Sequence, residues 1–365
     1  MPANRAKREE CLNWYMKNRE LYNACGSCVQ RLLTTLLSQA NIPVHSIQYR
    51  IKERDSFLDK CLKDRYTHPL DEITDVCGIR IITYTNSDVK SIRDLIETHF
   101  SIDADHSEDK AEKLQENEVG YLSVHYIAKL NSQRVLLEEY KPYRDICFEI
   151  QVRTLLQHAW AEIEHDRSYK FGGELPKDVK RRFYLIAGTL ELMDREFDLL
   201  AREIEDYAKK VHAEAKSGTL SFAIDSTSLS EYLKVKLKAF NDIDPTFCGG
   251  DKELIQELTD CEIHTLAQLD ELMDSDILMR LYEIAQATGG TNYIGFLRGI
   301  LMVTMPKKYF QDAWKHHWAG IYQEEFERYA TINPEINQFS SLLDFVPFDP
   351  CFDPYPDYMD DIELL

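Results

Sequence analysis

The chain contains 365 residues, 44% of them hydrophobic and 29% charged, which is enough for one large globular domain or two of ordinary size. Its formal net charge of −20 argues against loose binding of nucleic acid over the whole surface, because such binding uses Lys and Arg to neutralise phosphates. The net charge does not exclude a local basic groove. No apolar run reaches the roughly 18 residues of a membrane helix, and the start "MPANRAKREE" lacks an apolar signal core. We expect a cytoplasmic protein without membrane contacts.

Strands alternate with helices in the first half of the chain, which predicts an α/β domain. In chain order we expect a helix at 8–40, a strand within 42–52 that includes "IQYRIK", a turn that runs into a strand within 71–84, an amphipathic helix at 87–100, a polar mobile loop at 103–118, strands at 120–130 and 146–154, and a helix at 154–170.

The second half of the chain is dominated by helical patterns. We expect a long helix at 176–216, a linker at 217–228 and an all-helical region at 229–330. The segment 344–365 carries seven acids, no base and four prolines, so it does not form an ordinary helix or a central strand. The predicted domains are 1–216, the linker 217–228, a helical domain at 229–343 whose role stays open, and an acidic, aromatic, Pro-rich tail at 344–365.

Nine cysteines are irregularly spaced, and their odd number argues against a disulfide framework. Cys25 and Cys28 form a CxxC motif, to which Cys261 and His264 are conceivable zinc partners. The motif lies in a helical pattern without a second CxxC. Buried free thiols are therefore the preferred interpretation.

Two predicted strands carry an unusual polar face. In "ICFEIQVRT" (146–154) apolar residues alternate with Cys147, Glu149, Gln151 and Arg153, which is the period of a half-buried strand. In "YLSVHYIAKL" (121–130) the polar set is Tyr121, Ser123, His125 and Lys129. Because consecutive strands are usually neighbours, the two polar sets are expected on one surface. A solvated sheet face is the alternative interpretation.

The presence of a second carboxylate favours a functional site over an ordinary solvent-exposed face of the sheet. "ITDVCGIR" places Asp75 just before a strand and Arg80 within it. Together with Glu149, Asp75 suits Mg²⁺, which prefers oxygen ligands and keeps substrate phosphates in its shell. Arg50, Lys52 and Lys60 would then neutralise those phosphates.

The common nucleotide and hydrolase motifs are absent from the sequence. There is no GxxxxGK[ST], no GxGxxG after a strand, and no legible Ser-His-Asp or Cys-His arrangement. A nucleotide site, if present, has another architecture.

Five blocks in order resemble the synthetase domain of the RelA/SpoT family over roughly residues 40–200. They are "YRIKERDSFLDK", "DEITDVCGIRII", "GYLSVHY", "FEIQVRTLLQHAWAEIEHD" and "YK". The resemblance implies a mixed β-sheet flanked by helices, similar to nucleotidyltransferases. It also implies transfer of pyrophosphate from ATP to the 3′-hydroxyl of a guanosine nucleotide, GDP or GTP, giving a (p)ppGpp-type alarmone. Residues upstream of Tyr49 are too few for the family's hydrolase domain, so we expect synthesis without hydrolysis.

The resemblance also implies a role for each matching residue. The ATP-binding set is Arg50, Lys52, Ser56, Lys60 and Arg80; the magnesium ligands are Asp75 and Glu149, with Glu149 as general base; the acceptor-binding set is Tyr121, Ser123 and His125; and the supporting set is Gln151, Arg153, Glu164 and His165. Structural or surface roles remain alternatives for Lys60, Glu164 and His165, and helix capping is the alternative for Ser56.

The acceptor is the least determined part of the prediction. Glu116 and Glu118 stand just before the GY motif, where relatives that use GTP or GDP usually carry lysine. Some small relatives are toxins that pyrophosphorylate the 3′ end of tRNA, and in fused forms a Tyr-x-x-Tyr element restrains them. Tyr355 and Tyr358 form such an element in the acidic tail, with a solvated disordered tail as the alternative.

Three hypotheses follow: an alarmone synthetase, a tRNA-modifying toxin autoinhibited by its C-terminal region, and a catalytically inactive nucleotide-binding module. The presence of both Asp75 and Glu149 argues against the third. The expected partners are ATP and the acceptor. A homo-oligomer and a triggering protein that binds the C-terminal region are further candidates, and the sequence leaves oligomeric state and trigger open.

Overall fold

The structure is a computed structural model of the chain, and it describes residues 2–109, 123–171, 176–240, 243–244, 251–288, 291–314 and 320–346. The chain divides into two compact units, Met1–Arg202 and Glu203–Leu365, and each is considered by itself. No described helix is long and apolar enough to cross a membrane.

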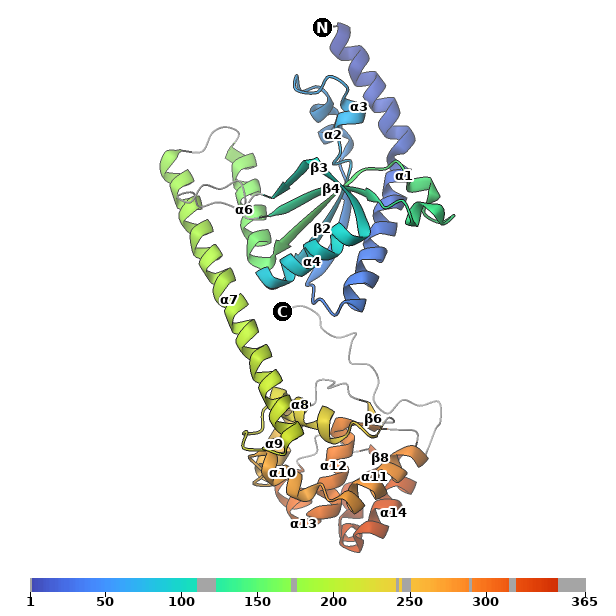
Figure 1. Ribbon diagram of the computed structural model, residues 1–365, viewed down its shortest axis with the longest axis vertical. Helices are drawn as coiled ribbons and strands as arrows, with labels where there is room; N and C mark the ends of the chain where they lie inside the picture. Colours follow the sequence, from blue (N-terminus) through green and yellow to red (C-terminus); the bar gives the residue numbers. More distant parts are fainter. Residues whose placement is uncertain are drawn as a thin grey trace. The chain divides into compact units, whose positions relative to one another are not determined.

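The N-terminal unit is built on a five-stranded mixed sheet in the order β1-β2-β5-β4-β3 (Figure 1). The central pair β2 and β5 is parallel, and the other neighbours are antiparallel. The strands are β1 (Ser46–Ile51), β2 (Cys77–Thr83), β3 (Phe100–Asp109), β4 (Val124–Leu130) and β5 (Phe148–Thr154). The prediction of a mixed sheet flanked by helices is confirmed.

One face of this sheet is the core of the unit. Phe148, Ile150 and Val152 of β5 are fully buried, as the alternation in the sequence predicts. The helices α1 (Pro2–Gln39) and α4 (Asn86–His99) lie beside the sheet (Figure 1). Both supply apolar side chains to the same cluster. Burying that face against two helices leaves the polar alternate residues of the strands for the opposite face.

The short helices between β1 and β2 form a smaller core with the first half of α1. Phe57 and Cys61 of α2 (Arg54–Cys61) are fully buried there, and α3 (Pro69–Glu72) follows. The remaining elements of the unit are the 3₁₀ turns η1 (Arg134–Leu136) and η2 (Lys141–Tyr143) and the helix α6 (Leu155–Phe171).

The predicted loop at 103–118 is partly wrong, because β3 extends to Asp109. Its backbone pairs with β4, with Ile102 opposite Ala128, and a register shift separates Asp103 from Glu108. An edge strand needs only one paired side and tolerates polar side chains, so its polar composition misled the sequence interpretation. The rest of the predicted loop lies outside the described residues.

The helix α7 (Lys177–Ser217) connects the two units, and the division between them falls within it. The predicted linker at 217–228 differs from what is observed. Leu220, Phe222 and Ile224 pack against the C-terminal core, and the backbone N–H of Leu266 donates to the carbonyl oxygen of Phe222. These alternating apolar side chains make the segment part of the C-terminal unit.

The C-terminal unit is mostly helical, but it also contains two short parallel strand pairs that the all-helical prediction missed. Its core includes the fully buried Leu233, Leu297 and Tyr309. In order its elements are α8 (Ser226–Lys236), β6 (Ile243–Asp244), α9 (Asp251–Asp260), α10 (Leu266–Leu272), α11 (Ser275–Ala287), β7 (Thr291–Asn292), α12 (Tyr293–Thr304), α13 (Pro306–Lys308), the π-helix η3 (Tyr309–Ala313), β8 (Gly320–Tyr322), α14 (Gln323–Ile332), η4 (Pro334–Leu342) and β9 (Asp344–Val346).

Candidate active site

The register of the sheet aligns polar residues from different strands into rungs. Arg50 on β1 is opposite Gly78 on β2, and Gly78 is opposite Glu149 on β5. Glycine at the middle of this rung leaves open space between an arginine and a carboxylate. A Cβ atom at Gly78 would come no nearer than 4.0 Å to Glu149 Oε2. A glycine inside a strand pattern is the signal by which sequence reasoning could have found this position.

A second rung lies two residues further along the strands. It contains Gln48, Arg80, Gln151 and His125, from β1, β2, β5 and β4 respectively. Residues two apart on a strand point to the same face, so both rungs belong to one surface.

These rungs form the floor of a pocket. Among the described residues it is lined by Gln48, Tyr49, Arg50, Lys52, Asp75, Gly78, Ile79, Arg80, Glu149 and Gln151. Asp75 and Glu149, which are far apart in the sequence, therefore face one cavity together with three of the predicted ATP-binding cations. This convergence is the geometric requirement of the predicted chemistry.

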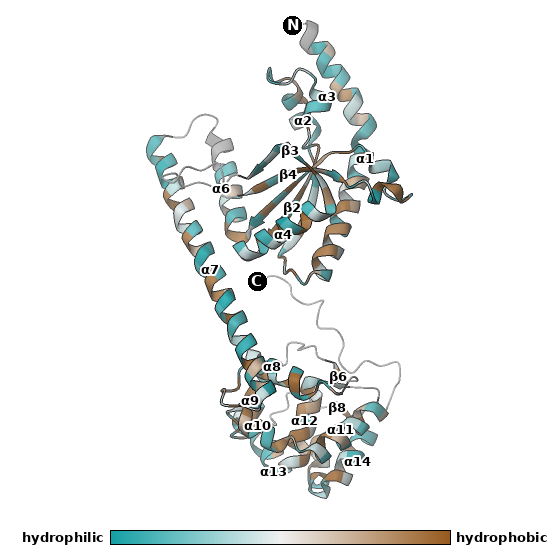
Figure 2. Cartoon of the chain, in the orientation of Figure 1, coloured by the Kyte–Doolittle hydropathy of each residue, from teal (hydrophilic) through white to brown (hydrophobic). Residues whose placement is uncertain are grey.

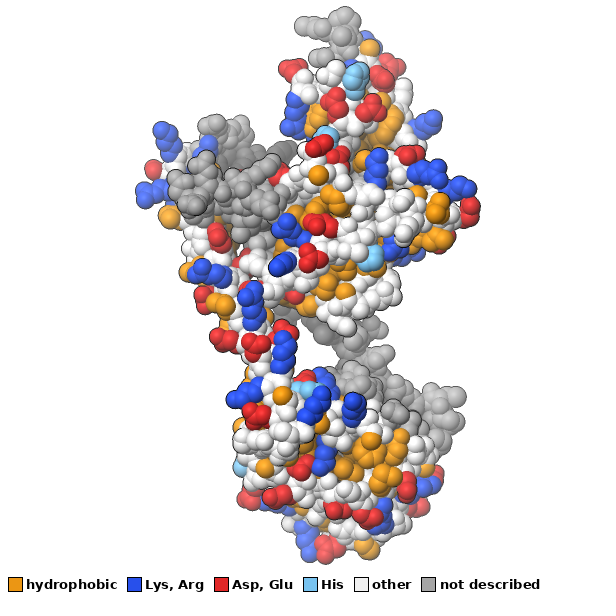
Figure 3. All heavy atoms as spheres, in the orientation of Figure 1, with side chains coloured by type: hydrophobic (Ala, Val, Ile, Leu, Met, Phe, Trp, Pro, Cys, Tyr) orange, Lys and Arg blue, Asp and Glu red, His pale blue; other side chains and the backbone are white. Residues whose placement is uncertain are grey.

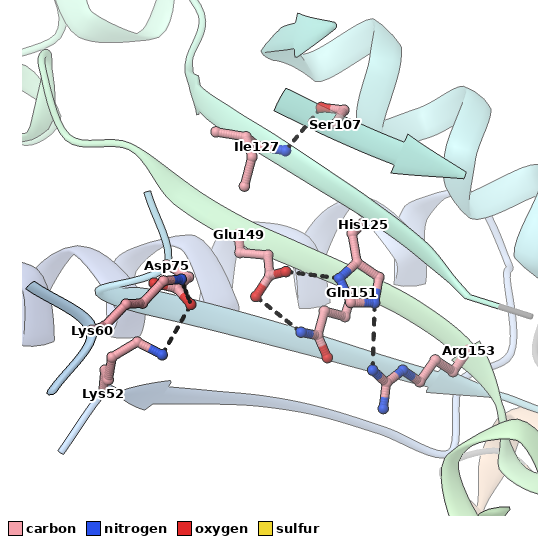
Figure 4. Close-up of polar contacts among 9 residues, drawn as sticks. All are labelled: Lys52, Lys60, Asp75, Ser107, His125, Ile127, Glu149, Gln151 and Arg153. Atoms are coloured by element: carbon pink, nitrogen blue, oxygen red, sulfur yellow. Dashed lines mark hydrogen bonds and ion pairs between the residues drawn. The ribbon is translucent and has the colours of Figure 1, made fainter. Parts of the chain in front are cut away.

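Asp75 is held by two lysines (Figure 4). Lys52 Nζ lies 2.9 Å and Lys60 Nζ 2.7 Å from Asp75 Oδ2. Lys52 directly follows β1, and its backbone N–H donates to the carbonyl oxygen of Val76, which fixes it beside the residue before β2. Burial opposes ionisation of Asp75, but the hydrogen bonds from Lys60 and Lys52 outweigh it and lower the pKa of Asp75 below its usual value.

The second carboxylate oxygen of Asp75 is available. Asp75 Oδ1 is buried and has no hydrogen-bond partner among the described residues. A buried carboxylate oxygen without a donor is costly unless a ligand completes its shell. The arrangement fits a cation or a donor from a ligand at this oxygen.

Glu149 is held by neighbours on its own sheet (Figure 4). His125 Nδ1 lies 2.8 Å from Glu149 Oε1, and Gln151 Nε2 donates to Glu149 Oε2 at 2.9 Å. Arg153 Nη2 lies 3.5 Å from His125 Nε2. Both oxygens of the carboxylate are thus oriented.

The same contacts control the charge of Glu149. Burial opposes ionisation, but hydrogen bonding from His125 and Gln151 outweighs it and lowers the pKa of Glu149, while the nearby charge of Asp75 acts in the opposite direction. The partners that lower the pKa of Glu149 are thus a histidine and an amide.

Arg80 has a partner that the sequence interpretation missed. Arg80 Nη1 lies 2.9 Å from Glu162 Oε1 on α6, and His158 Nδ1 lies 3.9 Å from the same oxygen. Burial and the charge of Arg80 lower the pKa of His158. The available signal was the i, i+4 spacing of His158 and Glu162, which places both on one helix face.

Several predicted residues are not among the described residues that line the pocket. Ser56 is exposed and is the third residue of α2, whose N-cap is Glu53, so it does not cap this helix. Ser123 is buried, and its Oγ has no hydrogen-bond partner among the described residues. Glu164 is half-buried and His165 exposed on α6.

Three predicted residues lie outside the described residues. They are Tyr121, Tyr355 and Tyr358. The same applies to Glu116 and Glu118.

A family model described as "Region found in RelA / SpoT proteins" matches residues 49–174. The chain contains a RelA/SpoT region. That region includes every described residue of the pocket lining except Gln48.

Two proteins of Bacillus subtilis (strain 168) resemble the chain in sequence. GTP pyrophosphokinase YjbM is 25% identical over 178 residues, covering 48% of this chain and 81% of that protein. GTP pyrophosphokinase YwaC is 25% identical over 167 residues, covering 45% and 76%. The RelA/SpoT region thus relates the chain to proteins named GTP pyrophosphokinases, at a distance.

Solved structures are also similar to the chain. The small alarmone synthetase 1 from Bacillus subtilis gives a TM-score of 0.44 at 22% identity, covering 53% of this chain and 98% of that one. A GTP pyrophosphokinase family protein from Streptococcus pneumoniae gives 0.45 at 22%, covering 53% and 96%.

Proposed function

We propose that the chain is an ATP-dependent pyrophosphokinase that transfers the β,γ-pyrophosphate of ATP to the 3′-hydroxyl of a guanosine nucleotide and releases AMP. The observation that carries this proposal is that one pocket among the described residues contains Asp75 and Glu149 beside Arg50, Lys52 and Arg80. Pyrophosphoryl transfer depends on charge neutralisation and positioning more than on a covalent nucleophile, and the charged residues of the pocket support a proposal of this kind.

The cations of the pocket are suited to the triphosphate of ATP. In the structure Lys52 and Lys60 contact Asp75, and Arg80 contacts Glu162. Arg50 is exposed at the pocket and is free to reach an entering phosphate. We propose that, as ATP binds, its phosphates compete with the carboxylates for the other three cations. The negative charge of the phosphates then takes the place of the carboxylate charge beside these cations.

Mg²⁺ is the proposed cofactor, and Asp75 and Glu149 would hold it. The buried oxygen Asp75 Oδ1, which has no hydrogen-bond partner among the described residues, fits such an ion, and both carboxyl groups have lowered pKa values. The described residues contain no group of three or more His, Cys, Asp or Glu side chains that could hold a metal, so further ligands would be substrate phosphate and water. Bound Mg²⁺ would disperse charge on the phosphates.

Glu149 is the proposed general base. It takes the proton of the acceptor 3′-hydroxyl while the oxygen bonds to the β-phosphorus of ATP and the bond to the α-phosphate oxygen breaks, releasing AMP. His125 and Gln151 hold the carboxylate in place, at 2.8 Å and 2.9 Å. A lowered pKa keeps Glu149 ionised at neutral pH and therefore ready to accept the proton.

A tRNA 3′ end is the second candidate acceptor. The observation that favours it is the pair of acids, Glu116 and Glu118, before the GY motif. In this second reading the acidic tail restrains the enzyme, with Tyr355 and Tyr358 competing for the ATP-binding cations. The double variant Tyr355→Ala, Tyr358→Ala should then react faster than the unchanged chain, and an unchanged rate would dismiss the restraint.

The deciding experiment incubates γ-labelled ATP and Mg²⁺ with GDP, GTP or deacylated tRNA and separates the products. Label in a guanosine nucleotide supports the proposed function, and label in tRNA supports the second candidate. Glu149→Gln should lower turnover about 10³-fold or more and leave ATP bound, because it removes the base and keeps the shape.

Glu138→Gln is the matched control, since Glu138 is an exposed acid away from the pocket lining. Label in no product with any acceptor, or near-normal turnover by Glu149→Gln, contradicts the proposal. ATP affinity of both variants is measured by isothermal titration.

A further inference from the structure

A second cavity lies between α1 and the segment 134–143, which contains the turns η1 and η2. It encloses about 670 Å³, within the roughly 300–1,000 Å³ of small-molecule sites in proteins. Figure 1 shows this segment, in green, beside α1. None of the residues that line the cavity lines the pocket of Asp75 and Glu149. The cavity is therefore a separate candidate site in the N-terminal unit.

One wall of the cavity is a single stripe of α1. Cys28, Leu32, Thr35 and Gln39 line it at intervals of four, three and four residues, which places them on one face of the helix. Arg31 lines the cavity beside this stripe. Figure 2 shows that α1 becomes more hydrophobic towards the end that precedes β1. This wall thus combines apolar and polar side chains with one cation.

The opposite wall is held in place by the residues that begin its segment. The backbone N–H of Arg134 donates to Asn131 Oδ1 at 2.9 Å, and Asn131 Nδ2 donates to the carbonyl oxygen of His99 at 3.0 Å. The next residue, Val135, is buried in the core cluster of the sheet. These contacts fix the backbone of Arg134, so its side chain lines the cavity from an ordered turn.

Two arginines from these separate elements face the cavity. In the part of the chain that the structure describes, neither Arg31 nor Arg134 takes part in an ion pair. Arg134 Nε is buried and has no hydrogen-bond partner there. A buried N–H donor without an acceptor is costly, and the Nε edge of a guanidinium matches two oxygens of a carboxylate or phosphate. This part of the cavity is therefore suited to an oxyanion.

The other side chains of the cavity limit the kind of anion. Glu139 lines the same space, and its negative charge opposes a polyphosphate. Burial, the largest effect, raises the pKa of Cys28, the charge of Arg31 lowers it and the charge of Glu139 raises it, so both charges act on this space. Tyr140 and Tyr143 are half-buried against the core cluster and supply flat apolar surface. A ligand with one oxyanion and an apolar body fits better than a nucleoside triphosphate.

We propose that this cavity binds a small organic anion. Its carboxylate or phosphate group contacts Arg134 and Arg31, and its aromatic or apolar body packs against Leu36 and the rings of Tyr140 and Tyr143. Figure 3 shows Lys and Arg side chains beside hydrophobic ones on the surface of this part of the N-terminal unit. The proposal does not depend on the chemistry assigned to the candidate active site.

Isothermal titration of the full chain with phenyl phosphate and with phenylacetate tests the proposal. We expect at least one of these probes to bind with a dissociation constant below about 1 mM, and the tighter probe distinguishes phosphate from carboxylate. Benzyl alcohol, which lacks the charge, and inorganic phosphate, which lacks the ring, should each bind at least about tenfold more weakly than that probe. Binding of neither probe, or equal binding of benzyl alcohol or inorganic phosphate, overturns the proposal.

Variants locate the bound probe. Arg134→Gln should weaken its binding about tenfold or more, because a charge-assisted pair is lost. Arg31→Gln, at an exposed position of α1, should weaken it about threefold and keeps the test decisive if Arg134→Gln unfolds. Arg144→Gln is the matched control, an exposed arginine outside the lining, and should leave the affinity unchanged. An affinity that falls with Arg50→Gln, in the candidate active site, and with neither Arg31→Gln nor Arg134→Gln overturns the proposal.

The thiol of Cys28 gives an independent readout, because Cys28 lines the cavity. A saturating probe should slow its alkylation by iodoacetamide at mildly alkaline pH at least about threefold, as measured by mass spectrometry. Cys147, which is also half-buried but lies outside the lining, should react at an unchanged rate. An unchanged rate at Cys28, or equal slowing of both thiols, overturns the proposal.

Discussion

At the residue scale, three of the predicted ATP-binding cations, Lys52, Lys60 and Arg80, are already paired with carboxylates of the chain. Lys52 and Lys60 share Asp75, and Arg80 contacts Glu162. These ion pairs keep partly buried charges compensated before a nucleotide arrives. Binding of a triphosphate must therefore exchange one anionic partner for another, and the strength of the existing pairs contributes to ATP affinity.

The Arg80–Glu162 pair gives a direct test of this exchange. Glu162→Gln should strengthen ATP binding about two- to fivefold, because Arg80 loses a competing anion; Glu162 is more than half exposed, so solvent screening limits the effect. Isothermal titration with a non-hydrolysable ATP analogue measures it. Glu138→Gln, at an exposed acid outside the pocket lining, is the control and should leave the affinity unchanged. Weaker binding by Glu162→Gln would show that Glu162 orients Arg80 for the nucleotide.

At the element scale, α7 packs on the N-terminal unit through the carboxylate of Asp194, although burial opposes the ionisation of this group. Burial raises the pKa of Asp194, although Thr154 and Gln157 donate hydrogen bonds to it, and Asp194 Oδ1 has no hydrogen-bond partner among the described residues. A raised pKa in the folded state means that the protonated form is favoured by folding. The associated stability is present below the unfolded pKa of aspartate and is lost as the pH rises through the folded pKa.

Asp194→Asn should consequently stabilise the chain at neutral pH, by about 1 kcal/mol, because the amide keeps an acceptor for Thr154 and carries no charge. The gain should shrink as the pH falls towards the ordinary range of aspartate. Thermal unfolding at a series of pH values measures it, with Asp198→Asn for comparison, since Asp198 has compensating contacts with Ser87 and Arg202. A loss of stability in Asp194→Asn at neutral pH would contradict this prediction, because it would mean that the negative charge of Asp194 stabilises the packing of α7.

At the scale of the whole molecule, the chain has separate cores in its two units. The large C-terminal cluster contains residues from Val211 onwards, whereas both N-terminal clusters end at or before Val152. No described buried residue is shared between the clusters of the two units. Units with independent cores generally unfold independently.

Calorimetry of the full chain should accordingly show two unfolding transitions. A non-hydrolysable ATP analogue with Mg²⁺ should raise the temperature of one of them and leave the other in place, because the pocket belongs to the N-terminal unit alone. CMP, which is neither an adenosine nor a guanosine nucleotide, serves as the negative control and should leave both transitions unchanged. A single transition that moves as a whole with the analogue would contradict independent units.

Local patterns in the sequence are sufficient to predict the alternation of the strands, the helices that flank the sheet, and the residue types that can handle a polyphosphate. Local periodicity records which side of a strand or helix is buried, so Phe148, Ile150 and Val152 were predicted as core from their spacing alone. Residue chemistry singled out Asp75 and Glu149 because carboxylates on separate strands suit a hard ion.

Which side chains contact one another depends on how the chain folds in three dimensions. The pairs Lys60 with Asp75, His125 with Glu149 and Arg80 with Glu162 depend on strand register and on the docking of α6, which local patterns do not encode. The same reason explains why the sequence interpretation missed strand β3 and predicted a linker at 217–228. The polar segment β3 is ordered by backbone pairing with β4, and Phe222 packs against the core of the C-terminal unit. Long-range contacts depend on the whole folded chain, so local patterns in the sequence do not predict them.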